Sequence, residues 1–386
     1  MIIGTFALAA LFVAVGFVVK HSDEKLAIPV PQSIAAAVVS PLQELHTIVP
    51  QDEVTNGLTS ITSTSSQSAL SPATHASSTP ANAIAIDQEQ AVSRIKDPYT
   101  TAQLPSAVIN ATARAALVNI MCMPSGGSLH PISGSGVIID PRGIILTNAH
   151  VAQYVLLSED EDVNLSCVIR TGSPASSKWI AEVVYLPPAW AQEHASELNT
   201  SRPLGTGEHD YAFLRIIASS NNAPLPATFP FMTPDSREAI GFLNDKVMVA
   251  GYPAEFLGGM GMQSNLFAAS SFSSIRQLIT FGTSSVDSIS LGGVIEAQSG
   301  SSGGAVVNMW GRLIGMISTM TDGTTTSQRD LRAITLSYID HDLTLQTGMN
   351  MNAFLAGNID DREQDFNDRL APDILQLYAS RLHTAQ

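Results

Sequence analysis

Short apolar runs separated by polar and turn residues fill the chain from Ala115 onward. They are rich in Val, Ile and Leu, and no long helical pattern lies between them, which is typical of β-strands. This pattern predicts an all-β fold, either a barrel or a sandwich. The runs are "ALVNIMCM", "SGVIID", "GIILTNA", "NLSCVIR", "KWIAEVVYL", "YAFLRII", "KVMVAGY", "RQLITFG", "GGAVVNM" and "LIGMIST".

Two further segments carry clear local signals. In "DPRG", Pro141 at the second turn position and Gly143 at the fourth predict a tight turn between two strands. The stretch from Ile359 to Leu382 has a helical pattern, and a break is expected at Pro372 because proline cannot continue a helix. We expect this C-terminal helix to pack on the β domain.

The first residues, "MIIGTFALAALFVAVGFVV", form an uncharged apolar run. As a helix it would extend roughly 27 Å, close to the hydrocarbon thickness of a bilayer. It lacks the basic start and the small-x-small cleavage site of a signal peptide, so a membrane anchor at residues 1–20 is favoured over a cleaved signal. Lys20 and Lys25 after the run indicate a cytoplasmic side there, but Asp23 and Glu24 adjoin them.

The rest of the chain, after residue 20, is expected to consist of three further parts. Residues 21–105 include the Ser/Thr/Ala/Pro tract "TSITSTSSQSALSPATHASSTPANA", which is too poor in apolar residues to offset the entropy of ordering and indicates a linker. Residues 106–345 hold the predicted strands, and residues 346–386 form a helical extension.

Charge and motifs exclude several classes of function. The net charge of −15 and the pI near 4.9 oppose binding to nucleic acid, which rewards clustered Lys and Arg. The two cysteines form no C-x-x-C pair, the nine histidines show no H-E-x-x-H spacing, and no phosphate-binding G-x-x-x-x-G-K-[ST] loop occurs. We therefore expect no metal and no cofactor.

Three polar residues stand at strand edges in a suggestive order. Ser302 lies between glycines in "AQSGSSGGAVV", His150 follows the run "GIILTNA", and Asp210 precedes "YAFLRI". Each alone has an ordinary explanation as a turn or surface residue. Together they supply a hydroxyl nucleophile, an imidazole base and a carboxylate that orients the base.

On "TNAHV", "DYAFLRI" and "GSSGGAVVN", the chain resembles the trypsin-like, chymotrypsin-fold serine proteases, and most closely their bacterial HtrA-like branch. The resemblance implies two six-stranded antiparallel barrels with the site between them, followed here by the C-terminal helix. His150, Asp210 and Ser302 would form the catalytic triad. The backbone N–H groups of Gly300 and Ser302 would form the oxyanion hole.

The chain departs from the family pattern in two places. Ser301 stands where digestive members carry an aspartate that pairs with a new N-terminus, so activation by that salt bridge is not expected. We expect no peptide-binding PDZ domain of the HtrA type, because residues 346–386 fall short of the roughly 50 residues of a small domain. The resemblance implies that the active form is reached by loop ordering or assembly. Whether the protein forms trimers, as many relatives do, stays open.

The resemblance also points to a substrate pocket. Glu296, six residues before Ser302, would lie near the pocket base and pair with Lys or Arg of a substrate, or it would turn toward solvent. Met320 would narrow the pocket and favour small residues, and Ser318 would support Asp210 through a hydrogen bond.

In the family's first barrel, the strands of Cys122 and Cys167 are neighbours. A disulfide there would indicate an oxidising compartment, and two buried thiols are the alternative.

These observations predict a membrane-anchored, extracytoplasmic serine endopeptidase, periplasmic or on the cell surface, that acts on polypeptides. If the N-terminal segment is cleaved, the protein is secreted. A catalytically silent protein with the same fold that binds exposed peptide segments is the alternative. An esterase, distinguished by comparing ester with peptide hydrolysis, and a structural surface protein on a Ser/Thr-rich stalk are further rivals.

Overall fold

The computed structural model describes residues 84–85, 98–126, 129–160, 162–198, 205–238, 240–255, 259–282, 285–321 and 323–384. The chain divides into two units, residues 1–73 and 74–386, and every described residue belongs to the second. The predicted anchor at residues 1–20 lies outside the described residues. Within the described ranges, no helix combines the length and the apolar character needed to cross a membrane.

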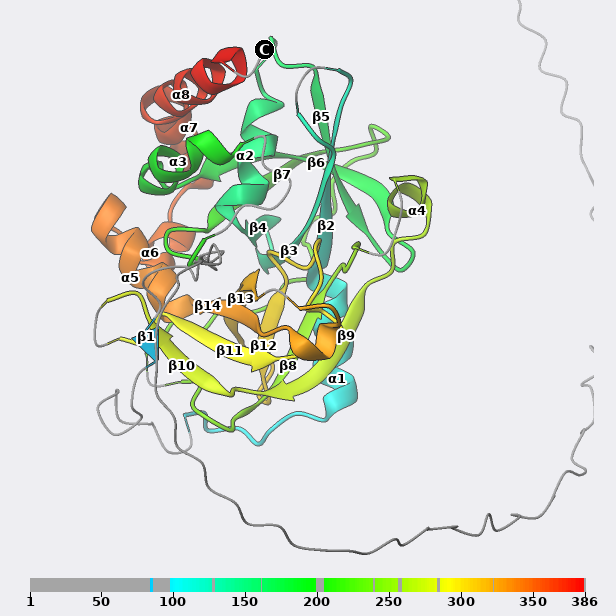
Figure 1. The fold of residues 1–386 in the computed structure, drawn as a ribbon, viewed down its shortest axis with the longest axis vertical. Coiled ribbons are helices and arrows are strands. Elements are labelled where there is room, and N and C mark those ends of the chain that lie inside the picture. Colours follow the sequence, from blue (N-terminus) through cyan, green and yellow to red (C-terminus); the bar gives the residue numbers. More distant parts are fainter. Residues whose placement is uncertain are drawn as a thin grey trace, which may run out of the picture. The chain divides into compact units, whose positions relative to one another are not determined.

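Six antiparallel strands form a closed barrel in the order β2-β3-β4-β7-β6-β5 (Figure 1). The predicted turn joins β3 to β4, where the Gly143 N–H donates to the Asp140 carbonyl and Gly143 has a φ of +86°. This first barrel matches the expected architecture. Its strands are β2 (Leu117–Pro124), β3 (Ile132–Asp140), β4 (Ile144–Thr147), β5 (Leu165–Thr171), β6 (Ser176–Tyr185) and β7 (Ala212–Ser219).

The second half of the expected fold differs from a six-stranded barrel. It is an eight-stranded antiparallel sheet with the order β1-β10-β11-β14-β13-β12-β8-β9, and the described pairings leave it open between β9 and β1. Its strands are β1 (Ile84–Ala85), β8 (Lys246–Gly251), β9 (Ala269–Ser274), β10 (Gln277–Thr280), β11 (Ser288–Gly292), β12 (Ala305–Asn308), β13 (Leu313–Met320) and β14 (Leu331–Thr335).

The physical reason lies at Ile275 and Arg276, the two residues between β9 and β10. On one side of this bend, β9 pairs with β8, and on the other β10 pairs with β11. Strands β9 and β10, which follow each other in the sequence, therefore stand near opposite ends of the strand order of this sheet. The pairing of β1 with the outer edge of β10 adds the eighth strand from the segment predicted as linker.

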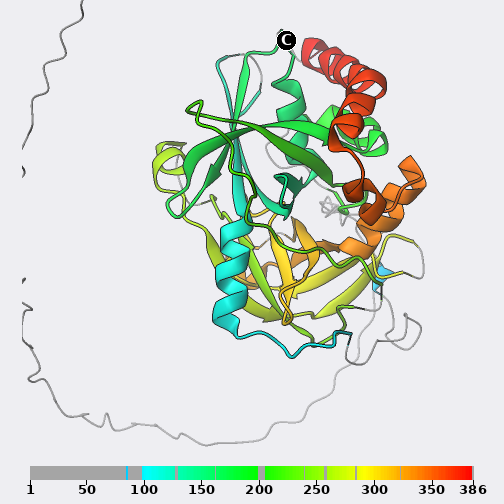
Figure 2. The same ribbon diagram turned by 180° about the vertical axis from the view of Figure 1, so that it is seen from behind.

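Helices pack against both sheets. Helix α1 contacts β8 and β12, whereas α7 packs against β6 and α8 against α7 (Figures 1 and 2). The C-terminal helix breaks at Leu370, so that Pro372 lies in the first turn of α8, where a missing N–H is tolerated. The helices are α1 (Ser106–Ala116), α2 (Ala149–Leu157), α3 (Pro188–His194), α4 (Gly259–Ser264), α5 (Leu336–Thr347), α6 (Met351–Ala356), α7 (Ile359–Arg369) and α8 (Ala371–Thr384), with short 3-10 turns at Ala195–Glu197 and Thr326–Gln328.

The described residues just before α1 are bound to the second sheet. The Tyr99 hydroxyl donates to Asp235 at 2.6 Å, and the Trp310 indole N–H donates to the Thr101 carbonyl at 2.9 Å. The guanidinium of Arg237 lies over the Tyr99 ring, 5.1 Å from its centre.

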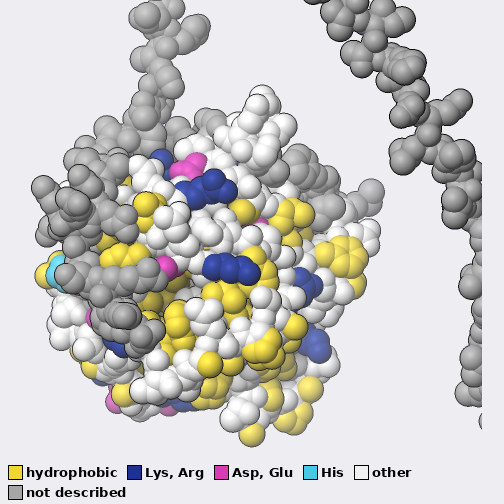
Figure 3. Space-filling view, turned by 90° about the horizontal axis from the view of Figure 1, so that it is seen from below, with side chains coloured by type: hydrophobic (Ala, Val, Ile, Leu, Met, Phe, Trp, Pro, Cys, Tyr) yellow, Lys and Arg dark blue, Asp and Glu magenta, His cyan; other side chains and the backbone are white. Residues whose placement is uncertain are grey.

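Seen from below, the molecule exposes apolar side chains with separate Lys and Arg side chains between them (Figure 3). Such cationic stems cover part of the apolar surface.

Cys122 and Cys167 lie directly opposite each other on β2 and β5 and form a disulfide. The bridge joins positions 45 residues apart. Replacing both cysteines by serine is expected to lower the free energy of unfolding by about 4 kcal/mol, because the unfolded chain regains the freedom of this loop. Urea unfolding with and without dithiothreitol checks this: the reductant should destabilise the native protein and leave the double variant unchanged.

Candidate active site

The motif "TNAHV" brings His150 and Asp210 together. His150 occupies the second position of α2, directly after β4. The Asn148 side chain donates to the Asp210 carbonyl at 2.9 Å, and the His150 backbone N–H donates to Asp210 Oδ1 at 3.0 Å. The start of α2 and the segment before β7 are thus held together by hydrogen bonds that involve backbone groups as well as side chains.

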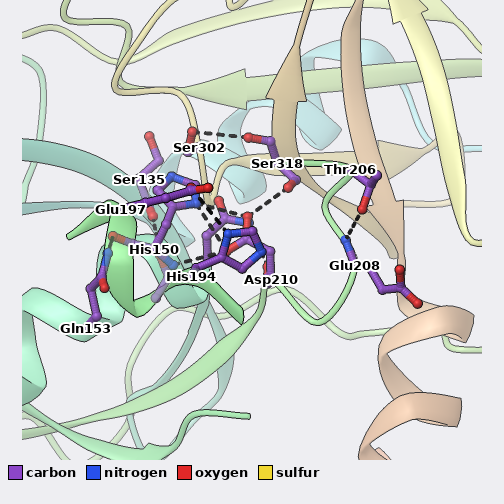
Figure 4. A network of polar contacts seen from close by, with 12 residues as sticks. Ser135, His150, Gln153, His194, Glu197, Thr206, Glu208, Asp210, Ser302 and Ser318 are labelled. Carbon is purple, nitrogen blue, oxygen red and sulfur yellow. Dashed lines mark hydrogen bonds and ion pairs between the residues drawn. The ribbon is translucent and has the colours of Figure 1, made fainter. Parts of the chain in front are cut away.

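The carboxylate of Asp210 is buried and receives three side-chain contacts (Figure 4). His150 Nδ1 lies 2.9 Å from Oδ2 and 3.1 Å from Oδ1, and the Ser318 hydroxyl donates to Oδ2 at 2.9 Å. Burial alone would raise the pKa of Asp210, but the nearby imidazole and these hydrogen bonds outweigh it and lower the pKa. The carboxylate therefore stays ionised and orients the imidazole ring.

Ser302 follows a turn and precedes β12, and its side chain is half-buried. Its hydroxyl contacts the Ser318 carbonyl oxygen at 3.3 Å, drawn as a dashed line in Figure 4. Among the hydrogen bonds between described residues, none joins this hydroxyl to the ring of His150. The His150 ring is therefore connected to β13 through Asp210 and the Ser318 hydroxyl. The Ser302 hydroxyl contacts the same strand at the Ser318 carbonyl oxygen.

The loop before Ser302 carries the backbone N–H groups that are expected to form the oxyanion hole. The Ala254 N–H donates to the Ser299 carbonyl at 2.8 Å, which fixes the peptide that carries the Gly300 N–H. Gly300 has a φ of +94°, and a Cβ there would lie 2.7 Å from the Tyr252 carbonyl oxygen. Within the described part of the chain, neither the Gly300 N–H nor the Ser302 N–H has an acceptor. An oxyanion hole requires N–H donors that no protein acceptor occupies, and among the described residues both groups meet this condition.

Ser135 on β3 is a site residue that the sequence analysis missed. Its hydroxyl donates to the Gly300 carbonyl at 2.7 Å and accepts from the Tyr252 N–H at 2.9 Å, while its N–H donates to the Ser302 carbonyl at 2.7 Å. It thereby joins the first barrel to the loop of Ser302. The available signal was the pair of glycines around it in "SGSG", because glycine inside a strand often marks a close backbone approach.

The three residues expected in the substrate pocket occupy different environments. Glu296 is fully buried, and its Oε2 accepts from the Ser271 hydroxyl at 2.6 Å, so it does not turn toward solvent. Burial raises the pKa of Glu296, and Oε1 has no hydrogen-bond partner outside its own residue. Met320, half-buried, packs against the apolar core of the second sheet, and Ser318 contacts Asp210. The structure therefore places Ser318 with His150 and Asp210.

Residues 134–316 match the family of the trypsin-like peptidase domain. This part of the chain is a trypsin-like peptidase domain. The match runs from β3 to within β13 and includes His150, Asp210 and Ser302. No curated protein matches the chain.

The peptidase domain depends on residues beyond the matched range. Ser318 and helices α5 to α8 follow residue 316. No three His, Cys, Asp or Glu side chains of the described ranges are grouped so as to hold a metal ion.

Proposed function

We propose that the protein is a serine endopeptidase. Ser302 attacks the carbonyl carbon of a peptide bond, and His150 accepts the hydroxyl proton and later donates it to the leaving amine. Asp210 holds the imidazole in the tautomer that can accept this proton, and the N–H groups of Gly300 and Ser302 bind the oxyanion. The family match supports peptide-bond hydrolysis, and this assignment of roles is the finer proposal.

One observation carries the proposal. The buried Asp210 carboxylate accepts from His150 and Ser318 beside a loop whose Gly300 and Ser302 N–H groups lack acceptors in the described chain. A carboxylate buried beside an imidazole costs desolvation energy, which a purely structural turn would not require.

The test is labelling of the full-length chain with a fluorophosphonate probe, which reacts only with an activated serine. We expect labelling of the native protein and none of Ser302→Ala, because the probe bonds to the Ser302 oxygen. Ser301→Ala is the matched control, since Ser301 is adjacent in the chain but fully buried. A folded native protein that stays unlabelled would contradict the endopeptidase proposal.

A silent peptide-binding protein is the second candidate. It is favoured by the contact of the Ser302 hydroxyl with the Ser318 carbonyl at 3.3 Å, which points the hydroxyl away from a base. Apo enzymes often acquire the nucleophile–base hydrogen bond only with substrate, so this observation alone does not decide against catalysis. Peptide binding without labelling would support the silent protein.

The proposed place of action is outside the cytoplasm, next to a membrane. The apolar residues 1–20 would anchor the chain, and a disulfide is typical of oxidising compartments. Assembly into trimers belongs to the same proposal. Carbonate extraction of membranes, protease protection of the domain, and light scattering of the purified protein test these three points separately.

Glu296 is the proposed determinant of substrate preference. A carboxylate with one oxygen that has no hydrogen-bond partner outside its own residue suits a Lys or Arg side chain before the scissile bond. We expect Glu296→Gln to lower kcat/KM for Lys and Arg substrates by roughly 100-fold and to leave Ala substrates nearly unchanged. Because a protonated carboxyl loses its attraction for a cation, the preference of the native enzyme should fall as pH drops through the raised pKa of Glu296. Unchanged preference in Glu296→Gln would remove Glu296 from the pocket.

A further inference from the structure

The residue before Asp210 has an unusual backbone conformation. His209 has a φ of +56°, in the left-handed region, and it is not a glycine. This conformation costs an L-residue free energy, so the surrounding structure must hold it in place. Any relaxation of His209 would move the next residue, Asp210, away from His150.

The polar contacts of the His209 backbone N–H and ring come from helix α5, whereas the His209 carbonyl accepts from the Tyr211 N–H at 2.9 Å. The His209 backbone N–H donates to the Tyr338 hydroxyl at 2.9 Å, and Nδ1 of its ring lies 2.9 Å from Asp342 Oδ1. Tyr338 and Asp342 are four residues apart and so share one face of the helix. Gln346, one turn further, donates to Asp342 Oδ2 at 2.5 Å and keeps that carboxylate directed toward His209.

Helix α5 is itself fixed to the second sheet. Thr335 caps its N-terminus by accepting from the Tyr338 N–H at 3.1 Å and donates to the Val286 carbonyl at 2.8 Å. The Phe281 ring packs edge-on against Tyr338 with ring centres 5.0 Å apart. The contact with His209 therefore connects the second sheet to the loop of the first barrel that carries Asp210.

We propose that α5 is part of the catalytic apparatus of this chain: Tyr338 and Asp342 hold His209 left-handed and thereby place Asp210 against His150. His209, Tyr338 and Asp342 are positioning residues, because none of them touches the reacting atoms. The proposal rests on the proposed triad. It assigns a function to a helix that lies wholly outside the matched peptidase range.

The charge of His209 contributes to this hold. The groups that face it are Asp342 and Tyr338 from α5, Glu193 from α3, and Glu208 on its own loop. The hydrogen bond with Asp342 raises the pKa of His209, against the opposing effect of burial. The charged pair is thus complete below the ordinary histidine pKa of about 6.5, and it weakens as pH rises through the raised value.

Three variants at position 209 of the full-length protein separate backbone strain from side-chain contact. Alanine at position 209 loses the Asp342 contact and keeps the strain, glycine loses the contact but removes the strain, and asparagine tolerates φ > 0 and can still donate to Asp342. We expect kcat to fall about tenfold in His209→Ala with KM nearly constant, less in His209→Gly, and least in His209→Asn. Asp342→Asn should lower kcat in the native background but not in His209→Gly. Asp365→Asn, which breaks an exposed ion pair on α7, is the matched control.

A pH profile and an NMR signal complete the test. The labelling rate of the native protein should decline at alkaline pH, and this decline should shift to lower pH in Asp342→Asn and disappear in His209→Asn. The proton between His150 Nδ1 and Asp210 should give a low-field signal that broadens or shifts in His209→Ala and returns in His209→Asn. Equal kcat in the native, alanine and glycine proteins, or an effect on KM alone, would overturn the proposal. If the native protein is not labelled, the endopeptidase proposal fails, whereas the NMR signal still decides whether His209 positions Asp210.

Discussion

Asp210→Asn is expected to lower kcat by about 10⁴ at neutral pH with little change in KM. The reason lies in the donors around the carboxylate. The His150 backbone N–H can only donate, so the asparagine oxygen must take the place of Oδ1. The amide nitrogen then takes the place of Oδ2, which lies 2.9 Å from His150 Nδ1. At the shorter of its two distances to the carboxylate oxygens Nδ1 then faces a donor, so we expect it to become an acceptor and the proton to move to Nε2.

An imidazole protonated at Nε2 cannot accept the proton of Ser302, which is why the loss should appear in kcat. Steady-state kinetics on a peptide substrate measure it. Ser318→Ala is the matched control, because it removes one hydrogen bond to Oδ2 without reversing the tautomer and should cost only about tenfold. A loss of less than tenfold in Asp210→Asn would mean that Asp210 does not orient the base.

The chemistry of the candidate site could be read from the sequence because it depends on residue types near strand ends. His150 and Asp210 follow and precede short apolar runs, and the structure brings them within hydrogen-bond distance. The Asp210–Ser318 contact was also expected, because the family resemblance places the strand of Ser318 along the cleft, and the structure shows this hydrogen bond. The single turn "DPRG" was predictable for the same local reason: Pro141 and Gly143 restrict the backbone without help from the rest of the fold.

The parts that the sequence did not indicate depend on contacts between distant segments. The residue pattern of a strand does not show which other strand it pairs with. Neither the β1–β10 pairing nor the bend at Ile275 could therefore be inferred from the sequence. The hydrogen bonds of Ser135 join β3 to a loop that lies far along the chain. The left-handed His209 has no sequence signal, because histidine is not a residue that requires this conformation, and α5 imposes it.

Gly303→Ala is expected to destabilise the domain by more than about 4 kcal/mol and to abolish activity. A Cβ at Gly303 would lie 1.9 Å from the Ser135 carbonyl oxygen and 2.6 Å from the Thr147 hydroxyl. Neither can move away freely, because the Thr147 hydroxyl donates to that same carbonyl at 2.7 Å and the Ser135 N–H donates to the Ser302 carbonyl at 2.7 Å. The methyl group would therefore force β3 away from the loop that carries Ser302.

The steric effect can be separated from backbone strain by a second glycine. Gly348 at the end of α5 has a φ of +75°, close to the +86° of Gly303, but a Cβ there meets nothing within 4 Å. Gly348→Ala should thus cost only the strain of a left-handed alanine, about 1 kcal/mol. Urea unfolding of the two variants gives the difference. Equal destabilisation of the two variants would show that β3 can withdraw from Gly303. In that case, the close approach of β3 to the loop of Ser302 would not be the cause of the alignment between Ser302 and the first barrel.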